Sequence, residues 1–136
     1  MRFSTTWLLI VSAVIELAAG LALSIAPSAM THLLVGVGLD LPESRLVARI
    51  AGAALLAIGL TCWVGRGRDR SRARIGLVAG LSVYNAAVVI LFVWAGGVAK
   101  MRGLGLWPAT LLHAILLAWC LVRLRFDGPT SMRAPN

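Results

Sequence analysis

The segment from Arg74 to Gly96 reads RIGLVAGLSVYNAAVVILFVWAG and has no charged side chain after its first residue. At about 1.5 Å per residue, a helix of this length crosses the roughly 30 Å hydrocarbon core of a bilayer. Three further apolar runs cover about residues 7–26, 41–64 and 107–124. Backbone polar groups inside a bilayer must be satisfied within the protein, and short connections make sequential helices antiparallel neighbours. We therefore predict an all-α integral membrane protein, folded as an antiparallel four-helix bundle.

The composition supports this class. Hydrophobic residues make up 60% of the 136-residue chain and charged residues only 13%, which leaves too little polar surface for a soluble domain. The formal net charge is +8, but the cations cluster at the ends of the apolar runs. Membrane proteins place cations there to fix their orientation. We therefore expect the lipid bilayer as the main partner and no nucleic-acid binding.

The distribution of cations predicts the orientation in the membrane. Cytoplasmic loops carry an excess of Lys and Arg. Residues 65–74 contain five arginines, residues 123–133 contain three, and Arg2 precedes the first run. The opposite side has only Lys100 and Arg102, with Arg45 and Arg49 at the start of the second run. Both termini and residues 65–74 are therefore predicted to be cytoplasmic.

The chain is predicted to form one domain, residues 1–126, followed by a disordered cytoplasmic tail, residues 127–136, with Gly and Pro. Asp40 and Glu43 have the D-x-x-E spacing of a capping box, which predicts the start of the second spanning helix. Residues 27–35 are too apolar for a plain linker. They fit either a short helix, lying on the outer surface or tucked between spans and ended by Gly36 and Gly38, or an ordinary packed loop.

Each spanning run contains an ionisable or strongly hydrogen-bonding residue, which is costly inside a bilayer and so indicates a partner or a function. Counted from the outer helix ends, Glu16 and Asn85 lie near the midplane, and Arg49 and His113 lie in the outer half. We predict that these residues face one outward-opening polar pocket, with Tyr84 at its wall. The candidate ligand-binding residues are Glu16, Arg49, Tyr84, Asn85 and His113.

Two states of Glu16 follow from its surroundings. An extended arginine bridges about one and a half to two helical turns, so we expect Glu16 and Arg49 to pair directly or through one water. Such a pair keeps the carboxylate charged and can be purely structural. The alternative is an unpaired, neutral carboxyl that is able to carry a proton. For His113 we expect a hydrogen-bonded core residue and no metal, because the second histidine, His32, lies in the outer loop.

Small residues indicate where helices approach closely. Gly52 and Gly59 lie on the second run, and Gly76 and Gly80 have the G-x-x-x-G spacing on the third. This spacing is typical of packed membrane helices, because backbones without side chains between them can come into contact.

Two stretches resemble a known group of proteins. Residues 46–60 read LVARIAGAALLAIGL, and residues 106–113 read LWPATLLH. Together with Glu16 and the Tyr84-Asn85 pair, they resemble small bacterial four-helix membrane proteins of the DoxX-like kind, and related uncharacterised families, over about residues 7–124. The resemblance implies a bacterial inner-membrane location and, for some members, a role as a membrane subunit of quinone-linked oxidoreductases. It carries over no catalytic residue.

The small multidrug transporters are a second comparison. The chain is similar to them in having four short helices with a Glu in the first. It departs from them in its strong charge bias and in carrying Arg49 and His113.

Four functions are open on this sequence. Apolar helix walls with a few polar groups suit a small amphipathic ligand, quinone- or lipid-like, bound by a homo-oligomer or by a subunit of a membrane complex. The alternatives are a proton-coupled small-molecule transporter using Glu16, a purely structural membrane subunit, and a small membrane isomerase using Glu16 and His113 as acid and base. No sequence motif indicates a cofactor.

Overall fold

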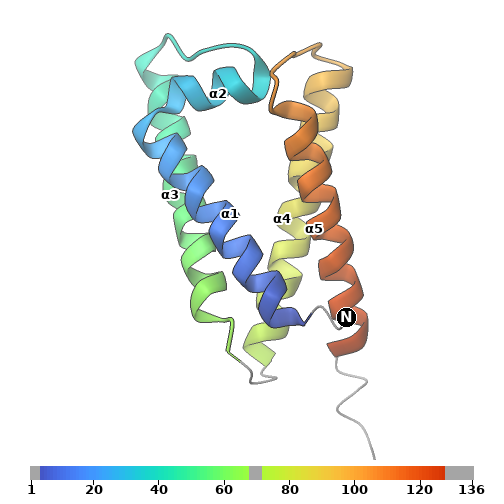
Figure 1. The fold of residues 1–136 in the computed structure, drawn as a ribbon. Helices are drawn as coiled ribbons and strands as arrows, with labels where there is room; N and C mark the ends of the chain where they lie inside the picture. Colours follow the sequence, from blue (N-terminus) through green and yellow to red (C-terminus); the bar gives the residue numbers. More distant parts are fainter. Residues whose placement is uncertain (1–3, 68–71, 128–136) are drawn as a thin grey trace, which may run out of the picture.

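The structure is a computed structural model that describes residues 4–67 and 72–127. These residues form five helices and no strand, which confirms the all-α prediction. The helices are α1 (Thr5–Ile25), α2 (Pro27–Val35), α3 (Pro42–Val64), α4 (Arg72–Gly97) and α5 (Leu106–Asp127). The four long helices lie alongside one another, and α2 lies across one end of them (Figure 1).

The four long helices correspond to the four predicted spans. Each is long and apolar enough to cross a membrane. Their ends differ from the predicted ones by three residues at most; the largest difference is at α5, which continues to Asp127. No Gly or Pro occurs between Pro108 and Gly128, so the sequence gives this helix no earlier stop signal. The predicted disordered tail from residue 128 onward lies outside the described residues, as do Arg2, Arg68 and Arg70.

The predicted capping box at the start of α3 is wrong. The residue at the N-cap is Leu41, and no side chain caps the helix. Pro42 occupies the first helical position, a place that suits its fixed φ, so Asp40 falls one residue too early to cap. The segment before α3 is held differently: the Leu39 N–H donates to the Ser28 hydroxyl (2.9 Å), and Arg45 Nε donates to the Leu39 carbonyl (2.8 Å).

Residues 27–35 form a helix and not a packed loop, which confirms the helical alternative, whereas its position at the outer surface stays a prediction. Helix α2 ends at Gly36, whose left-handed φ of 83° forms the C-cap. The Gly105 N–H donates to the Leu33 carbonyl (2.8 Å), so α2 contacts the connection between α4 and α5. Gly103 lies so close to α2 that a β-carbon there would be 2.2 Å from the Leu34 carbonyl oxygen. Helix α2 therefore ties the end of α1 to the α4–α5 connection.

Helix α3 packs along α1 through its glycines, as predicted for Gly52 and Gly59. A β-carbon at Gly52 would lie 2.9 Å from the Gly20 carbonyl oxygen, and one at Gly59 would lie 3.1 Å from the Ala13 carbonyl oxygen. From Gly52 to Gly59 on α3, the contacted position on α1 changes from Gly20 back to Ala13, so this pair of helices is antiparallel. The backbones touch directly, because no side chain separates them.

The same prediction is wrong for Gly76 and Gly80 on α4. A β-carbon at either position would meet nothing within 4 Å. Helix α4 packs on α5 instead, and the residues it buries include Val78, Leu81 and Asn85. The two glycines lie on a different face from these residues, because 3.6 residues make one turn.

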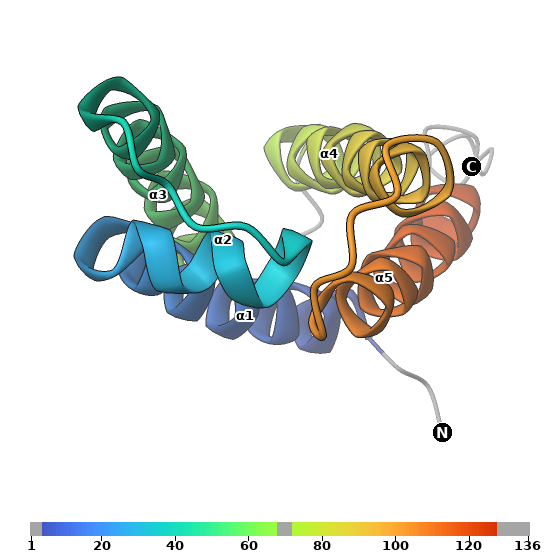
Figure 2. The same cartoon turned by 90° about the horizontal axis from the view of Figure 1, so that it is seen from above.

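The hydrophobic core joins all four long helices near the end where α1 begins and α5 ends. Its buried members are Leu8, Leu9, Ala13, Cys62, Val78, Leu81, Leu116 and Cys120. Seen from above, α3 and α4 lie on one side of the molecule, and α1 and α5 lie on the other (Figure 2). Large apolar side chains remain exposed on all four helices, among them Val14, Ile50, Val83 and Leu111.

Candidate functional site

Glu16 is buried in the middle of α1, with 1% of its surface exposed. It lies on the face that also buries Leu9, Ser12 and Gly20, at the three- and four-residue spacing that aligns side chains along one side of a helix. The Tyr84 hydroxyl of α4 donates to Oε2 of Glu16 (3.0 Å). Glu16 is thus held by a neutral hydrogen-bond donor from another helix.

A second pair links α4 to α5 through Asn85 and His113. Asn85 Oδ1 lies 2.8 Å from His113 Nδ1, and Asn85 Nδ2 donates to the Leu81 carbonyl (2.7 Å). With the amide nitrogen committed to Leu81, the oxygen faces the imidazole, and an oxygen only accepts. The hydrogen of this bond therefore sits on Nδ1. The other ring nitrogen, Nε2, then carries the lone pair of the neutral ring and is an acceptor.

Tyr84 connects the two pairs. Its ring meets the His113 ring edge to face with centroids 5.7 Å apart, while its hydroxyl reaches Glu16. Phe92 contacts the same imidazole edge to face at 6.3 Å. We call this set, drawn from α1, α4 and α5, the polar cluster: Ser12, Glu16, Tyr84, Asn85 and His113.

The polar cluster contains two buried oxygens without a hydrogen-bond partner among the described residues. They are Oε1 of Glu16 and Oγ of Ser12, which lies one turn earlier on the same face of α1. An unmet buried polar group costs about 1–3 kcal/mol, so such groups normally indicate a bound water or ligand. Sequence reasoning missed Ser12. Its position four residues before Glu16 was the available signal.

The predicted pairing of Glu16 with Arg49 is wrong. Arg49 is exposed, and among the described residues neither carboxylate oxygen of Glu16 has an Arg or Lys partner. The reason is the helix register. Gly59 contacts Leu17, the neighbour of Glu16, and Arg49 precedes Gly59 by ten residues, about 15 Å along the axis. An arginine side chain does not span that distance. Arg49 therefore lies outside the polar cluster.

A second group of polar contacts, which sequence reasoning also missed, lies at the start of α1. Arg74 of α4 donates to the Thr6 hydroxyl (2.9 Å), and Arg123 of α5 donates to the Thr5 hydroxyl (2.8 Å). Both arginines were interpreted only as signals of orientation. They also tie α4 and α5 to the first turn of α1.

Three comparisons, with protein families, with curated proteins and with solved structures, found no match. The resemblance to DoxX-like proteins therefore stays a prediction, and the function has to be argued from the polar cluster itself.

The bond between Asn85 and His113 gives a stability prediction. Asn85→Leu is expected to destabilise the protein by about 1 kcal/mol, because the Nδ1 hydrogen of His113 is left buried and unpaired. Unfolding in detergent, followed by circular dichroism, measures this. In a double-mutant cycle with His113→Phe, the second substitution should lower the free energy of unfolding less in the presence of the first than it does alone.

Ser82→Ala is the matched control for this cycle. The Ser82 hydroxyl also lies on α4, but within the described ranges it bonds only to the Ala79 carbonyl of its own helix (2.7 Å). We expect its effect to be additive with that of His113→Phe. Additive effects of Asn85→Leu and His113→Phe would contradict a bond between these two residues.

Proposed function

We propose that the chain is an integral membrane protein, an antiparallel four-helix bundle of the bacterial inner membrane with both termini and residues 65–74 in the cytoplasm. Three observations support this. Four helices are long and apolar enough to span a bilayer. Large apolar side chains are exposed along all of them, as expected for surfaces in contact with lipid. The excess of arginine lies at one end.

The topology predicts how introduced cysteines react with a membrane-impermeant maleimide. A cysteine replacing Asp40 should be labelled from outside intact cells, and one replacing Arg70 only after permeabilisation. The native Cys62 and Cys120 are buried, so the unsubstituted protein serves as the low-background control. Labelling of position 70 in intact cells, with protection of position 40, would reverse the proposed orientation.

The polar cluster is proposed to bind the polar head of a small amphipathic molecule. The observation that carries this proposal is the pair of buried, unpartnered oxygens on Glu16 and Ser12. In its ionised form the Glu16 carboxylate only accepts hydrogen bonds, and the serine hydroxyl also accepts them. Buried acceptors of this kind favour a ligand that donates hydrogen bonds.

The need for a hydrogen-bond donor narrows the range of quinone- or lipid-like ligands that the sequence suggests. A hydroquinone or a lipid hydroxyl supplies O–H donors, whereas an oxidised quinone supplies only carbonyl acceptors. The apolar helix faces around the cluster suit the rest of such a molecule. The proposal is therefore a membrane protein that binds a hydroxyl-bearing amphipathic compound, by itself or within a larger membrane complex.

Mass spectrometry of an organic extract from the detergent-purified protein tests this proposal. We expect one hydroxyl-bearing amphipathic molecule at close to one equivalent per chain. The control is an unrelated four-span protein purified from the same membranes in the same detergent. An extract identical to that of the control, together with a bound water between Glu16 and Ser12 in an experimental structure, would contradict ligand binding.

One observation favours proton-coupled transport as a second candidate. Such transport requires a carboxyl that gains and loses a proton, and no Arg or Lys among the described residues contacts Glu16 to hold it charged. In proteoliposomes, a transported solute should then move a proton in exchange, and Glu16→Gln should abolish that movement. Ligand binding without proton movement would contradict proton-coupled transport and leave ligand binding as the proposed function.

A further inference from the structure

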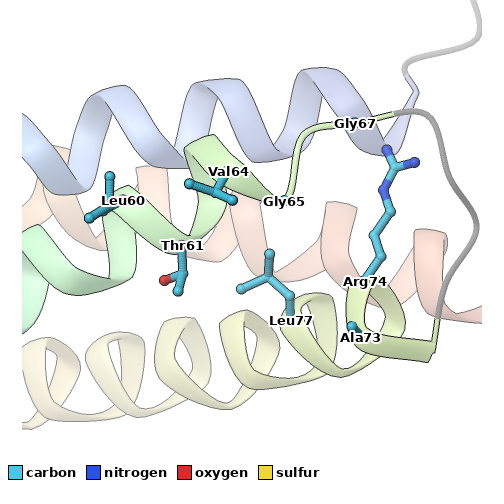
Figure 3. A pocket seen from close by; sticks show the side chains of 8 residues that line it. All are labelled: Leu60, Thr61, Val64, Gly65, Gly67, Ala73, Arg74 and Leu77. Carbon is cyan, nitrogen blue, oxygen red and sulfur yellow. The ribbon is translucent and has the colours of Figure 1, made fainter.

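Helices α3 and α4 leave a groove of about 530 Å³ between them at the end where α3 finishes and α4 begins (Figure 3). The two helices contact each other very little, since α3 packs on α1 and α4 packs on α5. The groove is lined by Leu60, Thr61, Val64, Gly65, Gly67, Ala73, Arg74 and Leu77. It is distinct from the polar cluster, which is built from α1, α4 and α5.

The walls of the groove are apolar. Leu60 and Val64 of α3 and Leu77 of α4 line it. In Figure 3 the side chain of Thr61 points from α3 toward α4, and that of Leu77 points from α4 toward α3. Thr61 adds little polarity, because its hydroxyl bonds to the Ala57 carbonyl of its own helix (2.6 Å) and leaves the methyl group as the remaining surface. An apolar wall on a spanning helix suits a hydrocarbon chain.

The mouth of the groove is positively charged. Arg74 lines it, and no Asp or Glu is among the described residues that do. Arg66 lies close by, over the ring of Trp63 with 3.8 Å between its central carbon and the ring centroid. With Arg74 at the mouth and Arg66 beside it, the described charge at this end complements an anion.

The groove also lies at the depth of a lipid headgroup. In the proposed orientation, the end of α3 and the start of α4 are at the cytoplasmic surface, whose leaflet is rich in anionic lipid. Leu60 lies four residues before the end of α3 at Val64, so the groove extends about 6 Å inward along this helix. That depth accommodates the first part of an acyl chain with its phosphate at the mouth.

We propose that this groove binds an anionic phospholipid of the cytoplasmic leaflet, with an acyl chain along Leu60, Val64 and Leu77 and the phosphate at Arg74. The proposal rests on the membrane insertion and orientation proposed above. It is independent of any ligand at Glu16, because the two sites share no residue.

Native mass spectrometry of the detergent-purified protein tests the proposal with two probes, dioleoyl phosphatidylglycerol and dioleoyl phosphatidylcholine. Because one cation near an anionic headgroup contributes about fivefold in affinity, phosphatidylglycerol should bind at least fivefold more tightly. Arg74→Gln should remove most of that preference. Thr61→Trp should fill the groove and weaken both lipids.

Each variant has a control at the same membrane depth. Arg125→Gln removes an exposed charge near the cytoplasmic end of α5, and Leu121→Trp adds bulk to an exposed position on the same helix. Neither should change lipid binding. Arg74 also holds Thr6, so Thr6→Val removes that hydrogen bond while keeping the charge, and it should keep the preference for phosphatidylglycerol.

Equal binding of the two lipids, or equal effects of Arg74→Gln and Arg125→Gln, would overturn the proposal. Loss of the preference in Thr6→Val would also overturn it, since Arg74 would then act through structure alone. Alkaline extraction of cell membranes separates this result from a failure of membrane insertion. A protein released by alkali contradicts both proposals, whereas one that is retained but lacks lipid preference contradicts only the lipid site.

Discussion

Glu16→Gln is expected to lower the amount of bound ligand about tenfold to a hundredfold while leaving the protein folded. The single oxygen of the glutamine amide still accepts the hydrogen bond from Tyr84. The amide nitrogen then takes the place of the unpartnered oxygen, so a donor faces the ligand instead of an acceptor. A hydrogen bond to a charged group contributes about 1.5–3 kcal/mol, which corresponds to the expected loss. Ligand per chain, measured by mass spectrometry, reports it.

The melting temperature separates this prediction from a structural role for Glu16. If Arg49 were its buried partner, Glu16→Gln would leave a cation buried alone and cost several kcal/mol. Arg49 is exposed, so we expect the melting temperature to change little. Ser24→Ala is the control on the same helix, because among the residues that the structure describes the Ser24 hydroxyl bonds only to the Gly20 carbonyl (2.8 Å). A large drop in the melting temperature, or unchanged ligand content, would contradict the prediction.

The sequence predicted the four long helices well because length and hydropathy do not depend on how helices pack. It also presented α2 as one of two alternatives, since Pro27 and Gly36 are start and stop signals whether or not a partner lies nearby. The capping box at Asp40 failed on a local detail. A proline one position further along shifted the start of the helix.

The site was predicted in part for a related reason. Glu16, Asn85 and His113 are costly in lipid, so they turn inward whatever the details of packing. The error with Arg49 came from counting depth from the helix ends, as if all helices ended at one height. The register depends on the contact of Gly52 with Gly20, and α3 extends well beyond the end of α1. A single sequence does not contain that register.

The role of Tyr84 also depends on how the helices pack, and a single sequence does not contain this information. The sequence placed it at the wall of the pocket, whereas its hydroxyl is the partner that holds Glu16. Which of two adjacent polar residues on α4 turns toward α1 and which toward α5 depends on the rotation of that helix. Tyr84 reaches α1, and Asn85 reaches α5. Only the packed structure shows this rotation.

The glycines of α3 and α4 lead to the prediction with the largest effect on stability. Gly59→Leu is expected to destabilise the protein by about 1–3 kcal/mol or more, because the new side chain is forced against α1. Its β-carbon would lie 2.7 Å from Leu17 Cγ and 3.0 Å from the Leu17 backbone nitrogen. A backbone atom cannot rotate away, so α1 and α3 must separate. Unfolding in detergent, followed by circular dichroism, measures the loss.

Gly80→Leu is the matched control, because a β-carbon there meets nothing within 4 Å. It should be tolerated, or even stabilise α4 by up to about 1 kcal/mol through the higher helix propensity of leucine. Equal losses at the two positions would contradict the packing of α3 on α1. A loss at Gly80 larger than at Gly59 would mean that this face of α4 is covered by something other than the described residues, none of which reaches it. Comparing the two losses of stability therefore tests whether Gly59 or Gly80 packs against another helix of the same chain.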